Sequence, residues 1–208
     1  MIIIGIAGKT HSGKSSLAMK LNHSYGWPIA SFAEGVRAEL ASAWFKRSGL
    51  TKRYTKWAEL EAREGKGAVR NLLQAWGHGR RVLTNESHWV DLLFKTLEGV
   101  DDEVIIIDDV RYPNEIQAIL DRGGFIVRLH ADAETLFERG ANPEALSHPS
   151  ENAISRNQTL HEALATNRVF QIETGNRDLK GVFCIFLEKA MGSISREINS
   201  LTRMEVGD

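Results

Sequence analysis

The chain has 208 residues, of which 42% are hydrophobic and 25% charged, and its formal net charge is −1 at pH 7. These values predict a globular protein with a sizeable core and one domain spanning residues 1–208. The near-zero charge argues against binding of duplex nucleic acid, and no apolar run reaches membrane-spanning length. The only cysteine, Cys184, cannot form an internal disulfide, which suits a cytoplasmic protein. Because Cys184 lies in the apolar run GVFCIFL, we expect it in the core.

The first element along the chain is a short apolar run, residues 1–6, which predicts a buried parallel strand. It leads into a glycine-rich segment that matches the pattern G-x-x-x-x-G-K-[ST] through Gly8, Gly13, Lys14 and Ser15. A helix is expected from Ser15 to Leu21. The motif therefore has the strand, loop and helix context that a phosphate-binding loop (P-loop) requires.

The residue types of this segment explain what it binds. Glycines let successive backbone N–H groups point at one anion, and the helix N-terminus adds partial positive charge. Lys14 reaches the β- and γ-phosphates of a nucleotide in such loops, and the Ser15 hydroxyl ligates Mg²⁺. We therefore predict an ATP site formed by Gly8, Lys9, Thr10, His11, Ser12, Gly13, Lys14, Ser15 and Ser16.

The next part of the chain reads as mainly helical. A strand is expected at Pro28–Phe32, followed by a helix at Gly35–Phe45. The highly charged run Thr51–Gly67 reads as an insertion around residues 51–67. Amphipathic helices are then predicted at Ala68–Trp76 and His88–Glu98.

Strands and helices alternate in the second half. The β-branched run Glu103–Asp108 is typical of a central parallel strand. After it we expect a helix at Asn114–Arg122 closed by Gly123 and Gly124, a strand at Phe125–His130 and a helix at Asp132–Arg139. Residues 140–159 read as a loop.

The last elements are a strand at Val169–Ile172 and a buried helix at Leu179–Ala190. Ile194, Ile198 and Leu201 form one helical stripe that packs on the body or, as an alternative, forms a homodimer contact. The alternation predicts an α/β fold: a three-layer α/β/α sandwich around a parallel sheet of about five strands. Ligands of such folds gather at the carboxyl ends of the strands.

Two aspartates, Asp108 and Asp109, follow the central strand. P-loop proteins place a carboxylate near Mg²⁺ at such a strand end, so we predict that Ser15 and Asp109 hold the metal, with Asp108 as the alternative. A solvated turn that caps the helix after Pro113 would explain the same residues without a metal.

Five blocks of the chain resemble the deoxynucleoside monophosphate kinases of tailed bacteriophages, from the P-loop to about Ile172. They are SGKSS at 12–16, SFAEGVRAEL at 31–40, VRNLLQAWGHG at 69–79 with HWV at 88–90, DDVRYPNE at 108–115, and HPSE at 148–151. The resemblance implies a P-loop fold of the nucleoside monophosphate kinase type, with ATP and Mg²⁺ as cofactors and nucleotides as its small-molecule partners. A phage-encoded enzyme would act in the host cytoplasm.

The chain departs from the family pattern at several positions. Ser15 and Ser16 stand where the family has aspartate and threonine, which returns the loop to the general P-loop form and puts the metal arrangement in question. Gly35 replaces a proline, and Arg37 replaces a lysine. Asn71 replaces a basic residue and removes one possible phosphate contact.

An acceptor monophosphate brings negative charge toward an anionic donor, so the site needs cations besides Lys14. Arginine suits this role because its planar fork binds phosphate oxygens in pairs. The matched blocks imply catalytic roles for Lys14, Arg70, Asp109 and Arg111. They imply substrate binding by Arg37, Arg70, Gln74, Gly77, His78, Trp89, Asp109, Arg111 and Glu115.

Some of these residues have a specific expected part. Gln74 lies one helical turn after Arg70 and could read a base edge. Trp89 could stack on the base, or it could be a core residue of the WVDLLF stripe. Gly77 is expected to end its helix. Glu115 is expected to hold an arginine or a sugar hydroxyl.

The resemblance implies a lid at residues 140–159, and the sequence leaves open what the residues in and around it do. Arg139 and Arg156 flank it. His148 and Glu151 match a family block without a physical explanation.

These features predict an ATP-dependent kinase that converts (deoxy)nucleoside 5′-monophosphates to diphosphates. One alternative is a P-loop kinase of another small molecule, such as dephospho-coenzyme A, in which Asp108 or Asp109 would act as a base toward an acceptor hydroxyl. The other is a nucleotide-gated ATPase module that acts on a partner. The base preference, the preference for ribose or deoxyribose and the oligomeric state are left open.

Overall fold

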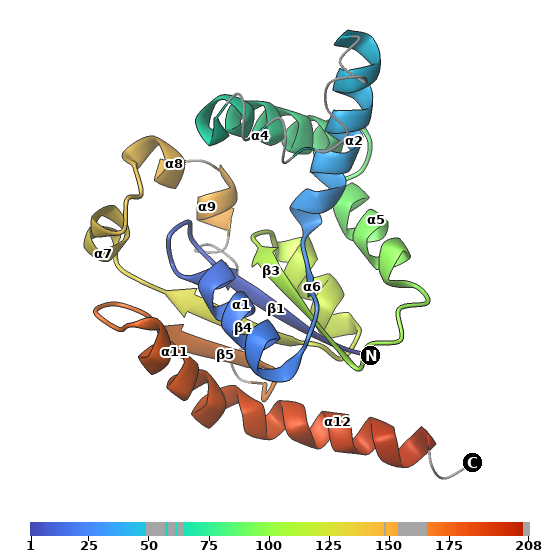
Figure 1. The fold of residues 1–208 in the computed structure, drawn as a ribbon, viewed down its shortest axis with the longest axis vertical. Helices are drawn as coiled ribbons and strands as arrows, with labels where there is room; N and C mark the ends of the chain where they lie inside the picture. The colour runs from blue at the N-terminus through green and yellow to red at the C-terminus, as the bar shows by residue number, and fades with distance from the viewer. Residues whose placement is uncertain (49–56, 58–60, 62–64, 148, 154–165, 206–208) are drawn as a thin grey trace. The chain divides into compact units, whose positions relative to one another are not determined.

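A computed structural model describes residues 1–48, 57, 61, 65–147, 149–153 and 166–205 (Figure 1). The chain divides into two compact units. The sheet unit comprises Met1–Ala30 and Val100–Asp208, and the helical unit comprises Ser31–Gly99. Among the described helices, none combines the length and apolar character needed to cross a bilayer.

The sheet unit is built on five strands. They are β1 (Ile2–Gly8), β2 (Ile29–Ala30), β3 (Val104–Val110), β4 (Phe125–His130) and β5 (Val169–Glu173). Their order is β2-β3-β1-β4-β5, and every neighbouring pair is parallel. The predicted parallel sheet is confirmed. The strands predicted within residues 1–6, 103–108 and 125–130 form its three central members, because β-branched runs suit strands buried on both faces.

Helices pack on both faces of this sheet, among them α1 (Lys14–Tyr25), α6 (Pro113–Asp121) and α11 (Leu179–Phe186). The sheet unit also contains α7 (Ala133–Glu138), α8 (Pro143–Ser147), α9 (Pro149–Ala153), the π-helix η2 (Leu187–Met191) and α12 (Gly192–Glu205).

The two faces of β1 show the layers. Ile4 belongs to a buried cluster with Leu17 of α1 and Phe186 of α11. On the opposite face, a Cβ at Gly5 would lie 2.7 Å from the Ile119 side chain of α6. The fold is therefore the predicted three-layer α/β/α sandwich.

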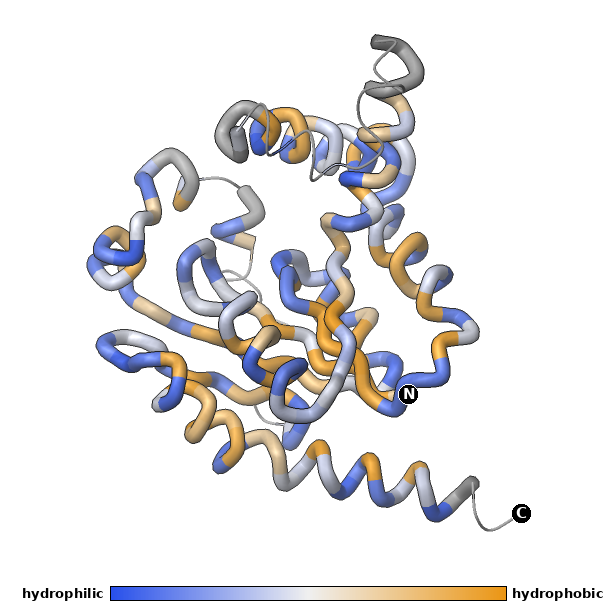
Figure 2. Tube along the Cα trace, in the orientation of Figure 1, coloured by the Kyte–Doolittle hydropathy of each residue, from blue (hydrophilic) through white to orange (hydrophobic). Residues whose placement is uncertain are grey.

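The C-terminal helix packs on the sheet unit, as its apolar stripe predicts. Ile194 is fully buried, and Ile198 and Leu201 pack against the same core. Figure 2 shows hydrophobic residues on the central strands and at intervals along α12. The alternative role of this stripe, a homodimer contact, is not needed to explain its pattern.

The helical unit contains α2 (Phe32–Ser48), α4 (Lys66–Leu83) and α5 (His88–Leu97). It has its own core of Leu40, Trp57 and Val69, with partly buried Ala41, Leu72, Leu73 and Trp76 packed against it. A polar cluster joins α2 to α4, because the Glu39 carboxylate accepts hydrogen bonds from the Trp76 indole and the Arg80 guanidinium. Most of the predicted insertion at 51–67 lies outside the described residues.

Three predicted elements differ from the structure. The second strand is only two residues long, and Phe32 begins α2 instead of ending the strand. Helix α4 continues to Leu83, so the prediction that Gly77 ends it was wrong. Residues 143–147 and 149–153 of the predicted lid loop are short helices.

Cys184 is exposed, so its predicted core position was wrong. Helix α11 buries Val182 and Phe186, which are four residues apart and share one face. Cys184 lies between them in sequence and therefore on the opposite side of the helix.

Candidate active site

The P-loop follows β1 at the carboxyl edge of the sheet, and its backbone takes conformations that favour glycine. Gly8 and Gly13 have φ values of 154° and 94°, and His11 has the left-handed value of 59°. A Cβ at Gly8 would lie 2.6 Å from both the Leu129 carbonyl oxygen and Ser12 Oγ. Gly8 is therefore required both by its backbone angle and by the space around it.

Lys14 is the first residue of α1 and is 7% exposed. Its Nζ donates a hydrogen bond to the Lys9 carbonyl oxygen across the loop, at 2.7 Å. Burial lowers the pKa of Lys14 to about 7, Arg111 acts in the same direction, and the carboxylates of Glu151, Asp109 and Asp108 oppose them. An incoming phosphate would supply the anion that favours the charged form of this lysine.

The next residue, Ser15, links the P-loop to the end of β3. Its hydroxyl donates to the Asp108 carboxylate at 2.9 Å. The contact that the structure gives for Ser15 is thus with Asp108, the residue that we had placed second to Asp109. A serine hydroxyl and a carboxylate this close are oxygen ligands that suit Mg²⁺, which takes few protein ligands and completes its shell with water and phosphate oxygens. Among the described residues, no group of three His, Cys, Asp or Glu side chains could hold a metal ion by itself.

The DDVRYPNE segment forms the end of β3 and the start of α6. Glu115 is 2% exposed, and its Oε2 accepts hydrogen bonds from the backbone N–H of Arg111 at 2.7 Å and of Tyr112 at 3.0 Å. These bonds fix the backbone that carries Arg111. Glu115 therefore does hold an arginine, but through the backbone N–H of Arg111.

Glu151 in α9 connects Arg111 to the P-loop. Its side chain is 1% exposed. One carboxylate oxygen accepts a hydrogen bond from the Thr10 backbone N–H at 2.6 Å, and the other pairs with the Arg111 guanidinium. Sequence reasoning found Glu151 within the HPSE block but could not assign these contacts. His148 lies outside the described residues.

A cavity of about 330 Å³ opens beside the P-loop. Its lining combines loop residues with the ends of α7, β5 and the start of α11: His11, Ser12, Gly13, Ser16, Arg139, Thr174, Arg177, Leu179 and Val182. Ser12 Oγ is buried and has no hydrogen-bond partner among the described residues, so it is available to a ligand. The volume is within the range of small-molecule sites.

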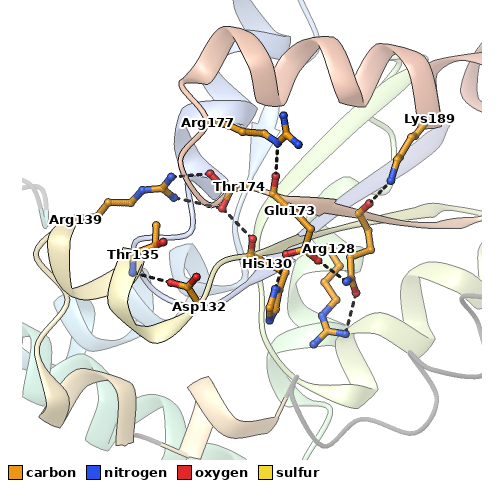
Figure 3. A network of polar contacts seen from close by, with 10 residues as sticks. Arg128, His130, Asp132, Thr135, Arg139, Glu173, Thr174, Arg177 and Lys189 are labelled. Atoms are coloured by element: carbon orange, nitrogen blue, oxygen red, sulfur yellow. Dashed lines mark hydrogen bonds and ion pairs between the residues drawn. The ribbon is translucent and has the colours of Figure 1, made fainter.

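Arg139 is fixed at this cavity. Its guanidinium donates to the Thr174 carbonyl oxygen at 2.8 Å and also contacts the Thr174 hydroxyl (Figure 3). It donates to the Gly175 carbonyl oxygen as well. The Thr174 amide in turn donates to the His130 carbonyl oxygen at 2.7 Å, which joins the ends of β4 and β5. Arg139 was predicted only to flank the lid. Arg156, its predicted companion, lies outside the described residues.

The α7 helix, which Arg139 follows directly, is capped at its N-terminus by Asp132. The Asp132 carboxylate accepts the backbone N–H of Thr135 at 2.8 Å (Figure 3). This backbone hydrogen bond and a second bond from the Thr135 side chain hold the pKa of Asp132 below its ordinary value. The N-cap therefore fixes the start of the short helix that carries Arg139.

The predicted acceptor residues Arg37, Arg70, Gln74, Gly77, His78 and Trp89 belong to the helical unit. Arg70 and Gln74 lie on α4, are both partly buried and share a helix face through their i, i+4 spacing. Arg37 is a partly buried residue of α2, and His78 is exposed on α4.

Trp89 is 2% exposed, and its indole N–H donates to the Gly77 carbonyl oxygen at 2.9 Å. The ring also lines a cavity of about 360 Å³ with residues of α2 and α5: Ser31, Phe32, Glu34, Gly35, Ala38, Leu92, Leu93 and Thr96. Such burial and bonding fit the alternative in which Trp89 is a packing residue.

Comparison with known proteins identifies the fold. The structure is similar to a gluconokinase from Sinorhizobium meliloti 1021, with a TM-score of 0.53, 14% identity, and coverage of 98% of this chain and 97% of that chain. It is also similar to a shikimate kinase from Acinetobacter baumannii in complex with shikimate, with a TM-score of 0.51, 13% identity and coverage of 93% and 94%. No protein-family model matches the sequence, and no curated protein matches it significantly.

Proposed function

We propose that this protein is an ATP- and Mg²⁺-dependent kinase that phosphorylates (deoxy)nucleoside 5′-monophosphates to diphosphates. The observation that carries the proposal is the P-loop itself: Lys14 is buried within it, and Ser15 is hydrogen-bonded to a carboxylate at the end of β3. The P-loop kinase fold supports the assignment as a kinase, and the sequence resemblance supports a nucleoside monophosphate as its acceptor.

ATP would bind along the carboxyl edge of the sheet. The backbone N–H groups of the P-loop and the charged form of Lys14 would hold the phosphates, while Ser15 and Asp108 would ligate Mg²⁺. Mg²⁺ would neutralise phosphate charge during transfer. The cavity between the P-loop and Arg139 is large enough for the nucleoside part of ATP, and a guanidinium can stack on a purine ring.

The acceptor site would be rich in arginine. Arg111 lies at the P-loop through its pair with Glu151 and would bind the acceptor phosphate. For Arg70 and Gln74, a part in binding the acceptor phosphate and base is inferred from the sequence resemblance alone. The acceptor oxygen is already a phosphate anion, so transfer requires no strong general base. A monophosphate acceptor therefore suits a site whose requirement is positive charge.

A second candidate is a P-loop kinase with a hydroxyl acceptor. Asp108 and Asp109 favour it, because a carboxylate near the transferring phosphoryl group could accept the hydroxyl proton. In that case Asp109 would matter as a base, and monophosphates would not be phosphorylated.

The test is a coupled assay of ADP release with purified protein, ATP and Mg²⁺. The acceptors would be a panel of ribo- and deoxyribonucleoside monophosphates together with dephospho-coenzyme A, gluconate and shikimate. We expect acceptor-dependent ADP release with one or more monophosphates. Release only with a hydroxyl compound would support the second candidate, and equal turnover without any acceptor would indicate an ATPase.

A further inference from the structure

The buried carboxylate of Glu151 has two different donors, one for each oxygen. Oε2 accepts from the Thr10 backbone N–H within the P-loop, at a sequence separation of 141 residues. Oε1 pairs with the Arg111 guanidinium after β3. One side chain of α9 thus joins two segments that the proposed reaction needs in a fixed geometry.

Burial of this carboxylate costs free energy, because a side chain that is 1% exposed has lost its contacts with water. The two contacts compensate for that loss. They also fix two groups that otherwise have freedom: the Thr10 peptide in a glycine-rich loop, and the long Arg111 side chain, which is 27% exposed. Because the backbone of Arg111 is held by Glu115, Glu151 completes the restraint at the guanidinium end.

We propose that Glu151 is a positioning residue that sets the P-loop through Thr10 and the acceptor-binding guanidinium through Arg111. The Arg111 part rests on the proposed function, in which that arginine binds the acceptor phosphate. The Thr10 part requires only that the P-loop bind a nucleotide.

The two contacts can be separated by substitution. Glu151→Gln keeps one carbonyl oxygen, which can accept the Thr10 N–H, but loses the charge that pairs with Arg111. Glu151→Ala removes both contacts. Glu138→Gln makes the same chemical change at an exposed residue of α7 and is the matched control.

The experiment measures Mg²⁺–ADP affinity by calorimetry, and kcat and KM for an accepted monophosphate, well below the thermal midpoint of each variant. For Glu151→Gln we expect ADP affinity within about threefold of the unmodified protein and a roughly tenfold to hundredfold loss of kcat/KM for the monophosphate. For Glu151→Ala we expect ADP affinity to fall as well, by roughly fivefold to tenfold. Glu138→Gln should match the unmodified protein in ADP affinity and in kcat/KM for the monophosphate.

Arg111→Gln supplies the decisive comparison. If Glu151 acts on the acceptor through Arg111, adding Glu151→Gln to Arg111→Gln should cause little further loss of kcat/KM. Independent, additive losses would overturn the Arg111 part, and unchanged ADP affinity in a folded Glu151→Ala variant would overturn the Thr10 part.

A failure of the proposed function would be visible separately, as absence of phosphorylation of any monophosphate by the unmodified protein. The ADP affinities would still decide the Thr10 contact. The coupling between Glu151 and Arg111 would then be measured from the thermal midpoints of the unmodified protein, Glu151→Gln, Arg111→Gln and the double variant. Additive changes in the midpoint would overturn the coupling.

Discussion

At the scale of single residues, Lys14 lies in surroundings that disfavour its charged form. Burial lowers its pKa to about 7 when no phosphate is present. We therefore expect Lys14→Ala to leave the thermal midpoint of the ligand-free protein unchanged or raised, because the variant no longer buries an ammonium group.

The same substitution should abolish stabilisation by nucleotide. A ligand at 100 times its Kd stabilises a protein by about 2.7 kcal/mol, so Mg²⁺–ADP should raise the midpoint of the unmodified protein and of a Lys95→Ala control, which changes an exposed lysine. Phosphoryl transfer by Lys14→Ala should fall by orders of magnitude. Near-normal turnover in the folded variant would contradict the ATP site.

Arg70 tests the acceptor half of the proposal. The loss of a charge-assisted hydrogen-bond pair costs about 1.5–3 kcal/mol, or roughly tenfold to a hundredfold in affinity. In Arg70→Ala this loss should be seen in kcat/KM for the monophosphate, with much less effect on ADP affinity. Arg203→Ala, at an exposed position of α12, is the control. An equal loss in ADP binding would assign Arg70 to the donor site.

The sequence predicted contiguous site residues better than distant pairs. The P-loop was recognisable because its glycines, lysine and serine occur within one short motif. The Glu151 contacts could not be predicted, because they depend on a fold that brings together residues 141 positions apart. The choice between Asp108 and Asp109 could not be made from strand alternation, because the register between β1 and β3 shifts there: Gly5 pairs with Ile107, but Ala7 pairs with Val110.

At the scale of helices and strands, Trp89 shows how α5 is held against its neighbours. Its ring is buried, and its indole N–H bonds to the Gly77 carbonyl oxygen of α4. We expect Trp89→Ala to lower the unfolding free energy by about 3–5 kcal/mol, and hence the thermal midpoint by on the order of 10 °C. Trp89→Phe should recover most of this, although it lacks the N–H donor.

The readout that separates packing from base stacking is the monophosphate KM of the folded Trp89→Phe variant. Packing predicts little change in KM. A selective rise in KM with an unchanged midpoint would show that the ring contacts the acceptor base after all.

The polar cluster between α2 and α4 predicts a pH dependence. Burial acts to raise the pKa of Glu39, but hydrogen bonds from Arg80 and Trp76 outweigh it and hold the pKa below its ordinary value. A carboxyl whose pKa is lowered on folding contributes stability above its unfolded pKa, about 4.3, and loses it as the pH falls through the folded pKa.

Glu39→Gln should therefore lower the thermal midpoint at pH 7, and this difference should shrink as the pH falls below about 4.3. Glu34→Gln, an exposed change on the same helix, is the control. A deficit in the midpoint of Glu39→Gln that is constant from pH 7 to pH 3 would contradict the assignment of the stabilisation to the charged carboxylate.

Elements with a strong local pattern were predicted well, and boundaries set by tertiary packing were not. The central strands follow from runs such as VIIID in β3. Helix α4 was predicted to stop at Gly77, yet a glycine costs a helix only about 1 kcal/mol, and beyond it Arg80 hydrogen-bonds to Glu39 of α2.

At the scale of the whole molecule, each unit has a core of its own. The apolar cluster of the sheet unit includes Ile4, Leu17 and Phe186, and the cluster of the helical unit includes Leu40 and Val69. A single domain is the prediction that follows from the length of 208 residues. The α/β class was nevertheless predictable, because the P-loop and the alternating strands all lie in the sheet unit.

Separate cores predict separate local unfolding. Leu40→Ala should cost about 2–5 kcal/mol and raise amide hydrogen exchange mainly within residues 31–99, with β1 and β3 remaining protected. Ile194→Ala, in the sheet unit, should show the reverse distribution. Hydrogen exchange followed by peptide mass analysis distinguishes these outcomes from uniform loss of protection across the chain, which would indicate a single cooperative unit.

The π-helical turn at η2 determines how the C-terminal segment tolerates changes in length. Val182, Phe186, Ala190 and Ile194 recur every four residues and are all buried. Because an α-helix has 3.6 residues per turn, each step of four rotates the contact by about 40° around the helix. The wider turn at Leu187–Met191 counteracts this drift. A homologous chain that lost one residue here could regain regular α-helical bonding without turning its last helix, because about eleven residues make three whole turns of an α-helix. We therefore expect a one-residue deletion among relatives to be tolerated at this turn, with the stripe still buried.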